Sequence, residues 1–187
     1  MSKKSNFHPC LLTGYLNINF KSKFITFFLM KTALISELKK EIENLNPKEL
    51  RDLCIHFAKY KKENKELLSY LLFEAHDNQA YIKGVKTQVD ELFDEINKSN
   101  LYFAKKSLRK ILRLTNKFIK YTSSKQVEVE LLIYYCKKLQ ESGIQFQKST
   151  ALSNIYLRQI VKIKKALATL HEDLQFDYEE DVMELMN

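Results

Sequence analysis

Turn-forming residues are scarce in this chain of 187 residues, and this scarcity constrains the fold more than any other feature. Between Lys48 and Asn187 there are only two glycines, Gly84 and Gly143, and no proline. A β-sheet needs turn residues at each hairpin, and an α/β fold needs them at each crossover. Glycine-rich phosphate loops of the GxxxxGK[ST] or GxGxxG type are also absent. The sequence therefore predicts an all-α fold.

Apolar residues recur with the helical period of 3.6 residues from residue 32 onward. The pattern predicts helices near 32–45, 47–60, 64–77, 79–98, 101–122, 124–142 and 149–173. We expect six or seven antiparallel helices, arranged as a helical-hairpin bundle or as a short HEAT-like superhelix. The helix at 149–173 is apolar on much of its circumference, which is typical of a central helix.

The first two predicted helices each carry an apolar stripe that we expect to be buried. The stripes are Leu34, Leu38, Ile42 and Leu45 in the first helix, and Leu50, Leu53, Cys54 and Phe57 in the second. Between them, Asn46 is placed to cap the second helix, with Pro47 at its first position and Glu49 completing a capping box.

Two similar segments lie 61 residues apart, so that Leu71 and Leu72 correspond to Leu132 and Ile133. Self-similarity of this kind is typical of stacked helical hairpins, in which each unit needs a neighbour to bury its apolar face. The alternative is that two amphipathic helices rich in Leu, Phe and Lys match by composition alone.

Composition divides the chain into three segments. Residues 1–30 contain no Asp or Glu and no clear periodicity, and we expect a disordered or wrongly assigned extension there. The alternatives for that segment are an ordered arm or a membrane or export signal, although its apolar run of residues 24–30 is too short to cross a bilayer. We expect an all-helical domain over residues 31–176, followed by an acidic C-terminal tail over 177–187 that adds at most one short helix.

The net charge of +8 is distributed unevenly. Residues 100–170 contain 15 Lys or Arg and three Asp or Glu, a net charge of +12. Residues 171–187 contain seven Asp or Glu and no Lys or Arg, a net charge of −7. Asymmetry of this kind indicates a charged partner or a contact within the protein.

The predicted helix at 101–122 carries most of the candidate site. At 100° per residue, its cations fall within an arc of about 140°, while its apolar residues occupy the opposite side. The seven cations are Lys105, Lys106, Arg109, Lys110, Arg113, Lys117 and Lys120. Like charges at i,i+4 repel by a few tenths of a kcal/mol per pair, so an anionic partner would stabilise this face.

We expect this face to make the protein a non-enzymatic interaction module that binds an acidic protein surface or its own acidic tail. The alternative is sequence-nonspecific binding of nucleic acid by the same cations, with Tyr102, Phe103, Tyr121, Tyr134 and Tyr135 as stacking faces. A third interpretation is that these lysines are ordinary surface residues. We expect no membrane partner, because the wide apolar side of this helix matches packing in a bundle.

We predict no catalytic residue, metal site or cofactor. Glu74 and His76 are two positions apart and so lie on different faces of a helix, and no HExxH motif occurs. The carboxylates of residues 90–95 are spaced for a hard-cation site, but a solvated helix face explains them better. Three cysteines, Cys10, Cys54 and Cys136, are widely spaced without a CxxC motif, which favours a reducing cytoplasm.

Three stretches carry a resemblance to a known family. They are Ala104-Lys-Lys-Ser-Leu-Arg-Lys-Ile-Leu, Leu131-Leu-Ile-Tyr-Tyr-Cys and Glu141-Ser-Gly-Ile-Gln-Phe. Over residues 34–172 the chain resembles a family of uncharacterised bacterial all-helical proteins. That resemblance implies an all-α fold and transfers no functional residue. A looser similarity to HEAT-type repeats implies a concave binding surface without chemistry.

Overall fold

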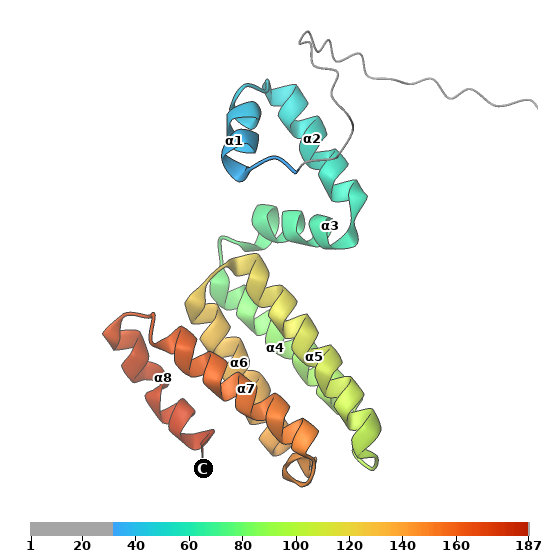
Figure 1. Cartoon of the computed structure of the whole chain (residues 1–187), viewed down its shortest axis with the longest axis vertical. Helices are drawn as coiled ribbons and strands as arrows, with labels where there is room; N and C mark the ends of the chain where they lie inside the picture. Colours follow the sequence, from blue (N-terminus) through green and yellow to red (C-terminus); the bar gives the residue numbers. More distant parts are fainter. Residues whose placement is uncertain (1–31, 187) are drawn as a thin grey trace, which may run out of the picture. The chain divides into compact units, whose positions relative to one another are not determined.

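The computed structural model describes residues 32–186, and every regular element in this range is helical (Figure 1). The prediction of an all-α fold is therefore confirmed, and the described part of the chain contains eight α-helices where six or seven were predicted. The predicted extension at residues 1–30 lies outside the described residues. The α-helices are α1 (Ile35–Glu43), α2 (Pro47–Tyr60), α3 (Lys62–Ser69), α4 (Asn78–Asp94), α5 (Leu101–Thr122), α6 (Lys125–Glu141), α7 (Thr150–Leu167) and α8 (Glu172–Glu184). A π-helical turn, η1 (Tyr70–Glu74), follows α3, and a 3-10 turn, η2 (Phe146–Lys148), precedes α7.

The described residues divide into two units at Leu45 and Asn46. The predicted domain over residues 31–176 spans this division. The first unit contains α1, and the Glu37 carboxylate accepts a hydrogen bond from the backbone N–H of Leu34 at 2.8 Å. The apolar stripe of α1 is exposed at Leu34, Leu38 and Ile42, contrary to the predicted burial.

The second unit begins with the predicted capping box. The side-chain oxygen of Asn46 accepts hydrogen bonds from the backbone N–H groups of Lys48 and Glu49, both at 3.0 Å. The Glu49 carboxylate accepts in turn from the N–H of Asn46 at 2.9 Å. The predicted burial of α2 is wrong, because no residue of this helix is buried and its stripe is exposed at Leu53 and Phe57.

Helix α6 is the centre of the bundle formed by α4 to α8. It packs against α4, α5, α7 and α8 (Figure 1). Its buried residues are Val127, Glu128, Val129, Leu131, Leu132, Ile133, Tyr135, Cys136 and Leu139. The central position predicted for 149–173 is wrong, since α7 leaves Leu157 57% and Val161 68% exposed. Helix α7 is covered by α6, α8 and η2, and its remaining side is open.

Polar contacts join α4 to α6 at the edge of the core. The Lys86 ammonium lies 2.7 Å from Glu130. The Asp90 carboxylate accepts hydrogen bonds from the Tyr134 hydroxyl at 2.6 Å and lies 2.9 Å from Lys138 Nζ. Burial raises the pKa of Asp90, but these two hydrogen bonds outweigh it and hold that pKa below its ordinary value. Asp90 is therefore used in helix packing.

The two segments that are similar in sequence occupy different environments. Leu71 and Leu72, in η1, are exposed, whereas the corresponding Leu132 and Ile133 are buried in α6. The similarity thus does not extend to equivalent packing.

The acidic segment is part of the bundle. The predicted boundary at residue 176 falls inside α8, whose Val182 and Leu185 belong to the core. The Tyr156 hydroxyl donates to the Leu185 carbonyl at 2.6 Å, which fixes the end of α8 against α7. Residues 177–184 are therefore a packed helix and do not form a separate tail.

This packing predicts that L185A destabilises the whole bundle. Leu185 is only 2% exposed, so the substitution leaves a cavity and should cost about 2–4 kcal/mol of unfolding free energy. Urea unfolding followed by circular dichroism measures the change. The matched control is M183A on the exposed side of α8, which should cost less than about 1 kcal/mol. Equal stability of L185A and wild type would contradict the packing of α8.

Candidate functional site

Helix α5 is unbroken over the predicted range, Leu101–Thr122. The Asn100 side chain caps it by accepting a hydrogen bond from the Tyr102 N–H at 2.9 Å. Its inner side buries Ala104, Leu108, Ile111, Thr115 and Ile119. The apolar and cationic sides of α5 thus separate as the sequence indicates.

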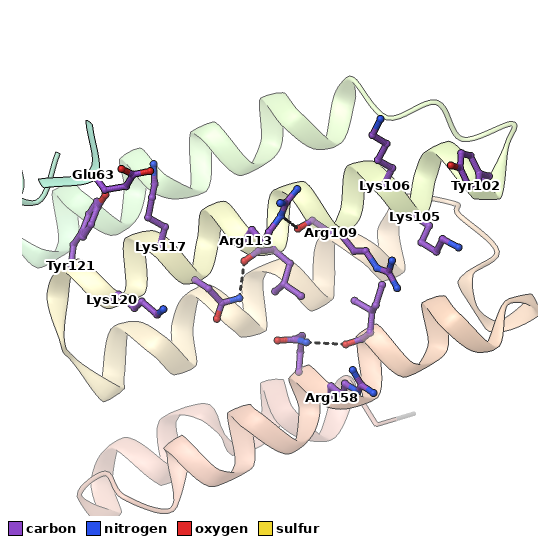
Figure 2. A pocket seen from close by; sticks show the side chains of 14 residues that line it. Glu63, Tyr102, Lys105, Lys106, Arg109, Arg113, Lys117, Lys120, Tyr121 and Arg158 are labelled. Atoms are coloured by element: carbon purple, nitrogen blue, oxygen red, sulfur yellow. Dashed lines mark hydrogen bonds between the residues drawn. The ribbon is translucent and has the colours of Figure 1, made fainter. Parts of the chain in front are cut away.

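A groove runs between α5 and α7, with a volume of about 1070 Å³ (Figure 2). Both helices pack on α6, which separates them. Near one end, Lys162 of α7 bonds to the Asn116 side-chain oxygen of α5 at 2.6 Å. The groove includes the apolar side chains of Leu112 and Ile155.

Cations dominate the walls of the groove. Six of the seven predicted site residues line it: Lys105, Lys106, Arg109, Arg113, Lys117 and Lys120. The seventh, Lys110, is exposed on α5 outside the groove lining. Arg158 of α7 adds a cation from the opposite wall (Figure 2). One carboxylate among the lining residues, that of Glu63, comes from α3.

Lys117 marks the end of the groove that lies near α3. Its ammonium is 2.7 Å from the Glu66 carboxylate, which also accepts a hydrogen bond from the Tyr121 hydroxyl at 2.8 Å. The hydrogen bond from Lys117 lowers the pKa of Glu66, and burial opposes this lowering. Burial, followed by the contact with Glu66, raises the pKa of Tyr121. This cation is therefore already neutralised within the protein.

The other groove cations differ in this respect. Within residues 32–186, no carboxylate lies within ion-pair distance of Lys105, Lys106, Arg109, Arg113, Lys120 or Arg158. Lys105 Nζ instead lies 5.6 Å from the centre of the Tyr102 ring, a cation–π distance. Six of the seven cations that line the groove thus have no carboxylate partner among these residues.

The acidic segment lies elsewhere in the bundle. Asp181 and Glu184 of α8 contact Lys137 of α6, at 2.6 and 2.9 Å. Among the described residues, no ion pair joins α8 to α5. The protein's own α8 therefore does not neutralise the groove in this arrangement.

Most of the aromatic residues considered as stacking faces are used in packing. Tyr135 is fully buried in α6, and Tyr134 and Tyr121 are bonded to Asp90 and Glu66. Tyr102 and Phe103 remain exposed at the start of α5. Of these two, only Tyr102 lines the groove.

Sequence reasoning missed Arg158, Leu112 and Ile155 as parts of this site. Periodicity assigns Leu112 and Ile155 to apolar stripes, and it does not reveal which helix faces α5. The net charge of residues 100–170 was the one signal that pointed to a cation beyond α5.

Over residues 32–186, no group of three or more His, Cys, Asp or Glu side chains is arranged to hold a metal ion. In the same range, none of the helices combines the length and apolar character needed to cross a membrane.

Comparisons with protein-family models, curated proteins and solved structures found no match.

The contact between Lys117 and Glu66 predicts a measurable titration shift. In K117M, the pKa of Glu66 should rise towards its usual value near 4.5, because its main stabilising hydrogen bond is lost. Carboxyl-carbon NMR during a pH titration measures this pKa.

The same contact makes stability depend on pH. A lowered pKa in the folded state stabilises the protein above the unfolded-state pKa, and this stabilisation is lost as pH falls through the folded-state pKa. The advantage of wild type over K117M should therefore be present at neutral pH and shrink in acid. The control is K110M, which should leave the titration of Glu66 unchanged. An unchanged Glu66 pKa in K117M would refute the assigned cause.

Proposed function

We propose that this protein is a non-enzymatic, cytoplasmic interaction module whose α5–α7 groove binds an acidic, amphipathic segment of a partner protein. One observation carries the proposal: the apolar side chains of Leu112 and Ile155 line the groove together with seven cations, and among the described residues only Lys117 of these seven has an ion-pair partner. A partner with carboxylates on both sides of an apolar stripe would satisfy both parts of the groove.

The dimensions of the groove favour a short helix as the bound element. Lys105 and Lys120 are separated by 15 helical positions, which corresponds to about 22 Å along α5. A helix of about 15 residues has the same length and presents apolar side chains at i, i+3, i+4 and i+7. Such a stripe would contact Leu112 and Ile155, while flanking carboxylates would face Arg109, Arg113 and Arg158.

Nucleic acid is the alternative occupant, since the same cations would bind phosphates. Its support is the exposed ring of Tyr102 beside Lys105, which could stack on a base. The apolar pair Leu112 and Ile155 has no role in that mode of binding. We therefore favour an acidic protein segment and use nucleic acid as a competing probe.

Fluorescence anisotropy with a synthetic probe tests the proposal. The probe is a labelled helical peptide of about 16 residues, in which glutamates flank a leucine stripe and which would be about 24 Å long. We expect it to bind wild type, and binding should weaken as salt rises from about 0.1 M to 1 M because the Debye length falls from about 10 to 3 Å. In the double variant R109E/R113E, binding should weaken at least about tenfold, equivalent to about 1.4 kcal/mol.

A matched variant distinguishes peptide binding in the groove from a general effect of the protein's net charge. K110E/K164E makes the same change in net charge with two exposed lysines outside the groove, and it should bind within about threefold of wild type. A scrambled peptide of the same composition tests the apolar stripe and should bind more weakly. Failure of wild type to bind the striped peptide would refute the proposal, and tighter binding of a single-stranded oligonucleotide would support the alternative.

A further inference from the structure

The outer face of α8 has the features that the groove requires of its partner. Phe176 is 78% exposed and Met183 is 51% exposed. They are seven residues apart, so they lie on the same stripe of the helix. Glu172, Glu179 and Glu180 flank this stripe, and all three are exposed. The outer face of α8 is therefore an apolar stripe bordered by carboxylates.

The opposite side of α8 fixes this face in place. Val182 and Leu185 are buried, and the Tyr156 hydroxyl bonds to the Leu185 carbonyl. Lys137 holds Asp181 and Glu184 from α6. Because these contacts use only the inner side and one edge, α8 presents its outer face as a preformed helix. A preformed helix loses less conformational entropy on binding than a disordered segment.

The charges of the two surfaces are complementary. Within residues 32–186, no Lys or Arg lies within ion-pair distance of Glu172, Asp177, Glu179 or Glu180. The groove cations are likewise without carboxylate partners, apart from Lys117. A helix running from Glu172 to Met183 extends about 17 Å, which is shorter than the groove segment of about 22 Å. The outer face of α8 thus matches the groove in charge, apolar content and length.

The two surfaces of one copy do not meet. Helix α8 packs against α6 and α7, whereas the groove lies between α7 and α5. Figure 1 shows α8 on the side of α7 that faces away from α5. A helix α8 that occupies the groove without leaving the core must therefore belong to another copy.

We propose that this protein self-associates by docking the outer face of α8 from one copy into the α5–α7 groove of a second copy. This proposal rests on the proposed function and names the partner of the same groove. Each copy carries both surfaces, so two copies either exchange their α8 faces reciprocally or extend the contact into longer assemblies.

Sedimentation velocity on the full chain tests the proposal. Wild type should sediment increasingly as dimers or larger species between about 1 and 100 μM at low salt, and it should return to monomer near 1 M salt. The groove variant R109E/R113E and the α8 variant E179K/E180K should each remain monomeric. All four substitutions are at exposed positions, so both variants are expected to fold.

Mixing the two variants provides the sharpest result. The groove variant keeps an intact α8 face, and the α8 variant keeps an intact groove. An equimolar mixture should therefore form a one-to-one heterodimer and stop there, because only one complementary pair of surfaces remains. Combining all four substitutions in one chain reverses the charges of both surfaces and should restore part of the self-association.

Three outcomes would overturn the proposal. The first is wild type that remains monomeric at about 100 μM in low salt, because a contact with a dissociation constant of about 10 μM would be largely occupied at that concentration. The second is self-association of the α8 variant equal to that of wild type, and the third is the absence of a heterodimer in the mixture. If any of these occurs while the striped peptide still binds the groove, the proposed function stands with a different partner. If the peptide also fails to bind, both proposals fail.

Discussion

Burial of α6 is the constraint on which the rest of the second unit depends. Side chains such as Leu132, Tyr135 and Leu139 are fully enclosed by the surrounding helices. A helix buried on most sides must be covered by several neighbours, and α4, α5, α7 and α8 provide this cover. Since α5 and α7 both pack on α6, their outer edges remain apart. The groove therefore follows from the way in which the core is enclosed.

The sequence predicts helix ranges and helix caps well, because these features are determined by residues that are close together in the chain. The range 101–122 agrees with α5, and the capping box formed by Asn46 and Glu49 is present in the structure. Gly143 follows α6 with a φ of 72°, the left-handed conformation that glycine commonly adopts just after a helix. Each of these features depends on residues within a few positions of one another.

Burial is predicted less well, because periodicity identifies an apolar face without identifying its cover. The stripes of α1 and α2 have the same periodicity as that of α5, yet they are exposed at Leu38 and Leu53. Helix α7 is the more apolar by sequence, but α6 is central because four helices contact it. The candidate site shows the same limit of prediction. The cationic face of α5 can be predicted from the sequence of that helix alone, whereas the contribution of Arg158 and Ile155 depends on which helix lies beside α5.

The arrangement of the residues that line the groove argues that its charge is more than an abundance of surface lysine. Elsewhere in the bundle, interhelical lysines are matched to carboxylates, as in Lys86 with Glu130 and Lys138 with Asp90. Lysines without an ion pair also lie outside the groove, as at Lys110 and Lys164, so the lack of a partner does not by itself distinguish the groove cations. What distinguishes the groove is that five such cations of α5, together with Arg158 of α7, line one surface with the apolar side chains of Leu112 and Ile155. Their mutual repulsion costs free energy in the isolated protein, and an anionic segment bound between the walls would remove that cost.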